Sequence, residues 1–162
     1  MTHVNDALVP VLDGRQSRPA VEIARGVCRL LWTLGFVSVG ELNLPNGRRA
    51  DVVGLSAKGD IWIVEIKSCV ADLRADRKWA EYADYCDRLL FAVDPSFPNE
   101  LIPKEAGLIV ADRYGGAILR EPAGHRLSGA RRKSMALLFA RAAAARLMLA
   151  ADPEVAIERI IE

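Results

Sequence analysis

The sequence predicts an α/β sandwich, in which a central mixed β-sheet is flanked by helices and followed by a C-terminal helical tail. Three observations predict this class. Segments whose apolar residues recur every three or four positions alternate with short apolar runs rich in β-branched residues. Some of these runs are joined by tight turns and others by a helical crossover, which together give a mixed sheet. The composition, 51% apolar and 27% charged over 162 residues, is that of a globular domain.

The first predicted elements are a helix and three strands. The helix begins near Ser17 or Pro19, because apolar residues follow at three-and-four spacing, and Gly35 is a natural stop. Two strands form a hairpin around the turn Pro45-Asn46-Gly47, and the turn Lys58-Gly59-Asp60 leads into a third. These strands cover residues 36–44, 48–56 and 61–68.

A second helix is predicted over residues 72–88, with an apolar stripe of Leu73, Trp79, Tyr82, Ala83 and Cys86. Three short strands, a long apolar helix and a short final helix follow, over residues 89–94, 106–112, 115–121, 129–149 and 153–162. We expect a single domain spanning 1–162. Its core would lie in about 18–121 and its C-terminal helices in about 129–162.

Nothing in the sequence indicates export or membrane insertion. The unbroken apolar runs are far shorter than the roughly 20 residues of a membrane span, and the N-terminus does not read as a signal peptide. We therefore expect a cytoplasmic protein without a membrane partner. Cys28, Cys69 and Cys86 are widely spaced and are expected to be reduced, buried packing residues.

The formal net charge of +1 neither favours nor excludes a polyanionic partner. Binding to nucleic acid would instead depend on local clusters of positive charge. The candidate clusters are Arg48-Arg49, Arg74 with Arg77-Lys78, and Arg126 with Arg131-Arg132-Lys133.

Charged residues interrupt the third predicted strand. Strand side chains alternate between faces, so Glu65 and Lys67 point the same way, and Asp51 on the preceding strand lies opposite them if the register permits. Partly buried carboxylates repel one another unless a cation neutralises them, and Mg²⁺ does so with oxygen ligands and water. Such an ion polarises a phosphate and activates a bound water, while Lys67 orients the water or stabilises the developing charge.

A purely structural interpretation competes with this one. Glu65 and Lys67 would then be an ion pair on a strand edge, and Asp51 a solvated turn residue. Two features favour the site instead. The strand is apolar on both sides of the charged pair, and an aspartate at the start of the preceding strand is the third group that the chemistry requires.

The order of Asp51 and Glu65-Ile66-Lys67, between two amphipathic helices, resembles the core of the PD-(D/E)xK nuclease superfamily, with Ala50 where the motif has proline. The segments GRRADVVGL, VEIKS, ADRKWAEYADYCDRLLFAVD and GLIVADRYGGAILRE are similar to the MmcB family of DNA-repair endonucleases. The resemblance implies a restriction-endonuclease-like fold and a deoxyribonuclease that depends on Mg²⁺ or Mn²⁺. It also implies that Asp51, Glu65 and the main-chain carbonyl of Ile66 bind the metal, with Lys67 as the catalytic amine.

Supporting residues have two interpretations each. Glu22 would be the extra acid that some superfamily members bring to the metal, or a first-turn glutamate favoured by the helix dipole. Glu41 would be an outer acid of the site or a solvent-facing charge. Asp76, Lys78 and Tyr82 could face the site or a phosphate, although Tyr82 at helical spacing also suits the core. The predicted DNA-binding residues are Arg48, Arg49, Arg77, Lys78 and Tyr82.

The expected partner is DNA, with other DNA-repair proteins as further candidates. Two alternatives to the nuclease stay open. One is a catalytically silent DNA-binding or scaffold protein that keeps the fold, and the other is a small homodimer joined through the apolar helix 129–149. The enzyme is favoured, because a binding module has no need for Asp51, Glu65 and Lys67 together.

Overall fold

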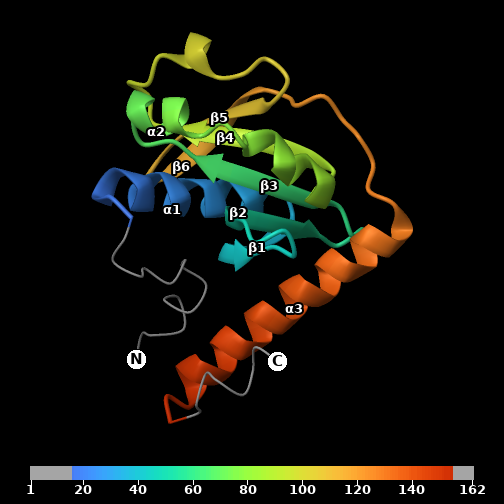
Figure 1. The fold of residues 1–162 in the computed structure, drawn as a ribbon. Coiled ribbons are helices and arrows are strands. Elements are labelled where there is room, and N and C mark those ends of the chain that lie inside the picture. The colour runs from blue at the N-terminus through green and yellow to red at the C-terminus, as the bar shows by residue number, and fades with distance from the viewer. Residues whose placement is uncertain (1–15, 155–162) are drawn as a thin grey trace.

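The computed structural model describes residues 16–154 (Figure 1). Helix α1 (Arg18–Thr33) begins as predicted, because the Ser17 hydroxyl accepts a hydrogen bond from the amide of Ala20 at 3.3 Å. A hydroxyl in this position satisfies an amide that the helix leaves unpaired. The chain leaves the helix through Gly35, whose φ of 83° is the left-handed conformation that favours glycine.

Six strands form one mixed sheet in the order β1-β2-β3-β4-β5-β6. The pairs β1–β2, β2–β3 and β5–β6 are antiparallel, whereas β3–β4 and β4–β5 are parallel. The predicted mixed sheet is confirmed. Its first parallel pair, β3–β4, is connected by residues 67–87, where the sequence predicted a helical crossover. The strands are Phe36–Asn43, Arg49–Ser56, Ile61–Ile66, Arg88–Val93, Gly107–Asp112 and Gly115–Arg120.

Helices cover both faces of this sheet, which confirms the α/β class. On one face α1 packs against Val52 and Val64. On the other face Val53 and Ile63 contact the 3₁₀ segment η2 (Trp79–Tyr85) and helix α3 (Gly129–Ala151). Because neighbouring strand residues point to opposite faces, β2 and β3 contribute to both cores. The site described below lies at the edge of the second core.

The prediction of one helix over residues 72–88 is wrong. The structure has a short helix α2 (Val70–Ala75), a non-helical link, and then η2. Asp76 is the physical reason. One of its carboxylate oxygens accepts a hydrogen bond from the Lys78 amide at 3.2 Å and the other binds the Lys67 ammonium at 2.7 Å. An aspartate that bonds to the backbone two residues later competes with helix formation.

Helix α3 was predicted over residues 129–149 and spans Gly129–Ala151. It buries Met135 and Phe139, but much of its surface is apolar and exposed, and it extends beyond the sheet past β1 (Figure 1). By length and composition alone, α3 could also span a membrane. This was not predicted from the sequence, because only unbroken apolar runs were considered there. The exposed apolar residues include Leu137, Leu147 and Met148. The predicted final helix 153–162 lies, after Glu154, outside the described residues.

The three cysteines are free thiols, as predicted. Cys86 is buried and Cys28 half-buried, but Cys69 is exposed, so the prediction that all three are buried is wrong. Cys69 immediately precedes α2, where the chain leaves the sheet. A position at the end of a central strand does not share the burial of the strand itself.

A partly buried ion pair between Arg132 and Asp87 joins α3 to the sheet. Asp87 precedes β4 and is 6% exposed. Its carboxylate accepts hydrogen bonds from both terminal nitrogens of Arg132 at 2.7 and 2.6 Å, and from the amides of Ile61 at 2.8 Å and Leu127 at 3.0 Å. Burial raises the pKa of Asp87, but these bonds outweigh burial and hold the pKa below its ordinary value.

Replacement of Asp87 by alanine should therefore destabilise the protein by about 3–5 kcal/mol, since the change leaves two amides without their acceptor and Arg132 with the Gly59 carbonyl but no opposite charge. A fall in pH should also destabilise the wild-type protein. Because the pKa of Asp87 is lowered in the folded state, its contribution is present above the ordinary pKa and is lost as the pH falls through the lowered one. Urea unfolding of both proteins at neutral and acidic pH measures these effects. Equal stability of the two at pH 7 would contradict the prediction.

Candidate active site

The site lies where β2 begins and β3 ends. Because these strands are antiparallel, with Val52 opposite Val64, the register brings Asp51 beside Glu65. Beyond that pair the strands are joined through side chains. The Asp51 amide donates to Glu65 Oε1 at 3.1 Å, and the Ile66 amide donates to Asp51 Oδ2 at 2.8 Å. Each carboxylate thus holds the main chain of the other strand, and the two predicted acids lie together.

Both carboxyl groups have raised pKa values. Burial raises the pKa of Asp51 by more than the hydrogen bond from Ile66 and the charge of Lys67 lower it. The pKa of Glu65, whose side chain is almost fully buried, is raised well above its ordinary value, first by burial and second by the negative charge of Asp51. Two neighbouring carboxylates that are withdrawn from water and repel each other favour a proton or a bound cation on the pair.

Lys67 follows β3 directly and is 7% exposed. The ion-pair partner considered from the sequence was Glu65, but the ammonium instead binds Asp76 Oδ2 at 2.7 Å. The ammonium also lies 5.8 Å from the centroid of the Phe91 ring, and Trp79 packs edge-on against that ring with the centroids 5.6 Å apart. Lys67 is therefore fixed from two sides at the edge of the acid pair.

Glu41 adds a third carboxylate from β1. It falls opposite Asp51 in the β1–β2 register, and its negative charge helps to raise the pKa of Asp51. Its φ of 49° is in the left-handed region, which is uncommon for a residue with a side chain and costs roughly 1–3 kcal/mol. Arg146 of α3 holds this conformation by donating hydrogen bonds to the carbonyls of Gly40 and Glu41.

The Glu41 carboxylate itself is held by two side chains. Its Oε1 accepts a hydrogen bond from Gln16 Nε2 at 3.1 Å and lies 3.4 Å from a terminal nitrogen of Arg49. Glu41 is 9% exposed, so the alternative of a solvent-facing charge is not what the structure shows. The acid is instead part of the same row of side chains as Asp51 and Glu65.

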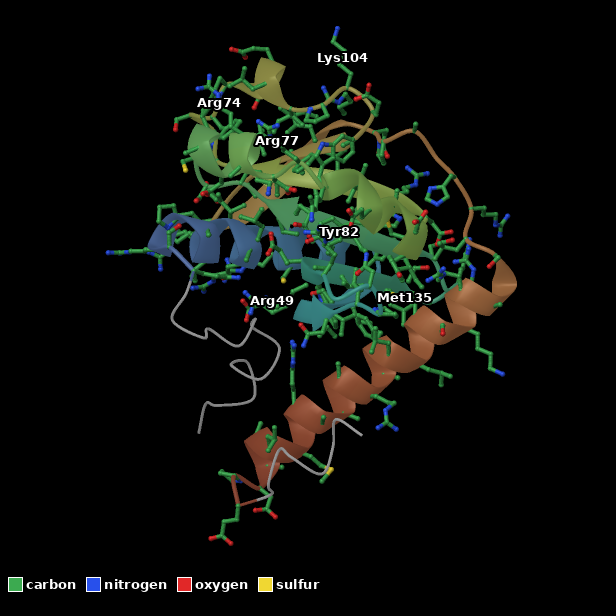
Figure 2. The ribbon with its side chains drawn as sticks, viewed as in Figure 1. Arg49, Arg74, Arg77, Tyr82, Lys104 and Met135 are labelled. Carbon is green, nitrogen blue, oxygen red and sulfur yellow. The ribbon has the colours of Figure 1, made fainter. Side chains whose placement is uncertain are left out.

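The predicted DNA-binding residues fall into two groups. Arg48 binds Glu81 at 2.9 Å, Arg49 lies beside Glu41, and the buried Tyr82 donates from its hydroxyl to the Arg49 carbonyl at 3.1 Å, so these three support the site internally. Arg77 and Lys78, by contrast, are exposed on the link between α2 and η2, next to the exposed Arg74 of α2. Figure 2 shows Arg74 and Arg77 on the same side of the domain as Lys104.

A cleft of about 360 Å³ opens beside the acid pair, lined in part by Gln16, Ser17, Asp51, Ile66 and Asp72. Glu22, the acid predicted to come from α1, does not line this cleft and pairs with Arg18 on the helix surface at 3.5 Å. Its proposed metal contact stays a prediction. Gln16, just before α1, lines the cleft instead. It was not predicted from the sequence, because it precedes the helix and is part of neither the apolar spacing nor a charged motif.

The carboxylates of Asp51 and Glu65 would be only part of the ligand set of a hard divalent cation. Within residues 16–154 no group of three or more His, Cys, Asp or Glu is arranged to hold a metal. The resemblance to nucleases predicts that the main-chain carbonyl of Ile66 is a third ligand beside the acid pair. Mg²⁺ commonly binds through one or two carboxylates and keeps several waters, so oxygen donors of this kind fit it.

The fold and these residues define an α/β protein with an acidic, lysine-bearing site at the carboxyl end of a central strand. The chain belongs to the MmcB-like family, whose model, described as DNA repair protein MmcB-like, matches residues 7–154. The predicted MmcB resemblance is thereby confirmed. A solved structure, the SPO1766 protein of unknown function from Silicibacter pomeroyi, is similar with a TM-score of 0.84 and 46% identity, over 88% of this chain and 98% of that one. No curated protein matches the sequence.

The raised pKa of Glu65 predicts a gain in stability when its charge is removed. Glu65→Gln keeps Oε1 as acceptor for the Asp51 amide, so at pH 8 without metal it should melt about 2–4 °C higher, the shift that roughly 1 kcal/mol gives in a chain of this size. A carboxyl group with a raised folded-state pKa loses stability as the pH rises through that pKa, so the difference should disappear in acid.

Thermal melts in EDTA from pH 4 to pH 8 measure the effect. Glu100→Gln is the matched control, since Glu100 is exposed in the short 3₁₀ segment Asn99–Leu101. A Glu65→Gln protein that melts below wild type at pH 8 would show that the acid pair is not strained.

Proposed function

We propose that the protein is a cytoplasmic deoxyribonuclease of the PD-(D/E)xK type, dependent on Mg²⁺ or Mn²⁺ and acting in DNA repair, with endonucleolytic cleavage favoured. The observation that carries this proposal is the placement of Asp51 and the buried Glu65 opposite each other, each bonded to a main-chain amide of the other's strand, with the buried Lys67 two residues after Glu65. A domain that needed only stability would not keep two carboxyl groups of raised pKa side by side at the ends of two neighbouring strands. Membership of a DNA-repair family supports DNA as the substrate.

In this proposal Asp51, Glu65 and the carbonyl of Ile66 hold the metal ion. When bound, the ion supplies a Lewis acid for the phosphate and a water of lowered pKa. The mutual hydrogen bonds of Asp51 and Glu65 with the two main chains keep both carboxylates in place before the ion arrives. Glu41 would act as an outer acid, through its charge on Asp51 rather than as a direct ligand.

Lys67 would orient the attacking water and stabilise the charge that develops on the phosphate. Its contact with Asp76 and the adjacent Phe91 ring fixes the ammonium in advance, so little reorganisation is needed during reaction. Asp76 is a positioning residue in this scheme, because it acts through Lys67.

The exposed residues Arg74, Arg77, Lys78 and Lys104 are the best candidates to contact the DNA backbone. Arg48 and Arg49 are paired with Glu81 and Glu41, so they would have to exchange these partners to reach a phosphate. The row of acids needs basic residues nearby, since negatively charged DNA would otherwise be repelled.

A catalytically silent DNA-binding or homodimeric scaffold protein is the second candidate. The exposed apolar side chains of Leu137, Leu147 and Met148 on α3 favour a contact with another chain. The ties of α3 to its own sheet, through Arg132 and Arg146, favour instead a helix of the domain. Light scattering distinguishes a dimer from a monomer.

The substitution Lys67→Met tests catalysis. Methionine has a similar length and no charge, so the metal ligands remain and metal affinity should be unchanged or slightly raised. Single-turnover cleavage of a panel of single-stranded, duplex and branched DNA with Mg²⁺ or Mn²⁺ should fall by about a hundredfold or more.

Asp76→Asn is the companion variant, because it keeps the acceptor oxygen near Lys67 and removes the charge. It should reduce cleavage by less than Lys67→Met does. Full activity of the Lys67→Met protein would remove the lysine from the mechanism, and a wild-type protein that cleaves no DNA form would leave the silent binding protein as the better proposal.

DNA binding should depend steeply on salt, because basic residues that contact phosphates release counterions. Arg77→Ala should weaken binding of every DNA sequence and reduce the slope of log affinity against log salt by about one. Lys58→Ala is the control, since Lys58 is exposed at the opposite end of β3 from the site. Fluorescence anisotropy in increasing NaCl measures both. An equal loss for the two variants would rule out a localised interface at Arg77.

A further inference from the structure

Gln16 carries an oxygen that the protein does not use. Its Nε2 donates to Glu41 Oε1 at 3.1 Å, whereas its Oε1 is buried and accepts no hydrogen bond from any described residue. The orientation of the amide follows from chemistry, because the reverse orientation would turn an oxygen toward the Glu41 carboxylate. A buried acceptor without a partner costs about 1–3 kcal/mol, so this position favours a donor or a cation.

The position of Gln16 relates this oxygen to the acid pair. Gln16 lines the same cleft as Asp51 and Ile66, two of the three residues proposed to hold the metal. The neighbouring residue Ser17 fixes the start of α1 against the end of β3, because its hydroxyl donates to the Ser68 hydroxyl at 3.3 Å. Gln16 therefore lines the cleft from a stretch of chain that is hydrogen-bonded to the residues after β3.

We propose that Gln16 Oε1 is a further ligand of the divalent cation, an inference that rests on the function proposed above. An amide oxygen is a hard, neutral donor of the kind that Mg²⁺ and Mn²⁺ accept. It adds a ligand without adding charge to a site where Glu41, Asp51 and Glu65 already repel one another. Gln16 then fills the position for which the sequence suggested Glu22.

A second role for Gln16 must be separated from this one. Its Nε2 holds Glu41, so a loss of metal affinity in a Gln16 variant could arise through Glu41 alone. The two roles differ in a double-mutant cycle with Glu41→Gln. A direct ligand keeps its effect when the charge of Glu41 has been removed, whereas a residue that acts only through Glu41 does not.

The experiment is calorimetric titration of the full chain with Mn²⁺, without DNA. The proteins are wild type, Gln16→Leu, Glu41→Gln, the double variant and Glu65→Gln. Gln16→Met, closer to glutamine in length, replaces the leucine variant if thermal melting shows the latter to be unfolded. Asn99→Leu is the matched control, because Asn99 Oδ1 is also buried without a partner among the described residues but does not line the cleft.

We expect Gln16→Leu to weaken Mn²⁺ binding by about tenfold or more, in both the wild-type and the Glu41→Gln backgrounds, and Asn99→Leu to have no effect. Wild-type affinity in Gln16→Leu, or a loss confined to the background with Glu41 intact, would overturn the inference and leave the proposed function standing. A wild-type protein that binds no Mn²⁺, or a Glu65→Gln protein that binds it normally, would overturn both.

Discussion

The site depends on two hydrogen bonds, in which the carboxylates of Asp51 and Glu65 each accept from a main-chain amide of the other's strand. Two antiparallel strands would ordinarily continue their ladder of backbone hydrogen bonds, but here each strand gives an amide to a carboxylate of the other. The acids cannot separate without breaking the end of the sheet. The hydrogen bonds between β2 and β3 thus keep the two carboxylates close despite their repulsion. The fully buried Val52 and Val64 beside them keep the strands from moving apart.

The irregular segment after β3 positions both sides of this pair. Trp79 acts on Lys67 through the ring of Phe91, and Tyr82 fixes the Arg49 carbonyl, two residues before Asp51. Asp76 serves two purposes with one carboxylate, since it ends α2 and binds Lys67. The break in the helix and the placement of the lysine are therefore the same structural event, and a continuous helix would remove the partner of Lys67.

Strand pattern predicted most of this architecture, because the alternation in β2 and β3 and the turns between them depend on local chemistry. The alternation predicted that Asp51 and Glu65 would meet if the hairpin register permitted it, and the register with Val52 opposite Val64 does so. The helix break was not predicted, because apolar spacing over residues 72–88 suits a helix, whereas Asp76 leaves it by bonding both to the nearby Lys78 amide and to Lys67 at the end of β3. The roles of Gln16 and Arg146 could not be predicted from the sequence, because each residue bonds to Glu41 across a long separation in the chain.

The contact of Arg146 with the carbonyls of Gly40 and Glu41 joins residues 106 and 105 positions apart. On a ribosome that adds roughly 5–20 residues per second, the later residue follows the earlier by roughly 5–20 s. Throughout that interval the strands and their acids exist without the guanidinium that fixes Glu41. The nascent chain thus carries an unfinished site until α3 has been made, so the site is completed only after the whole sheet has been synthesised.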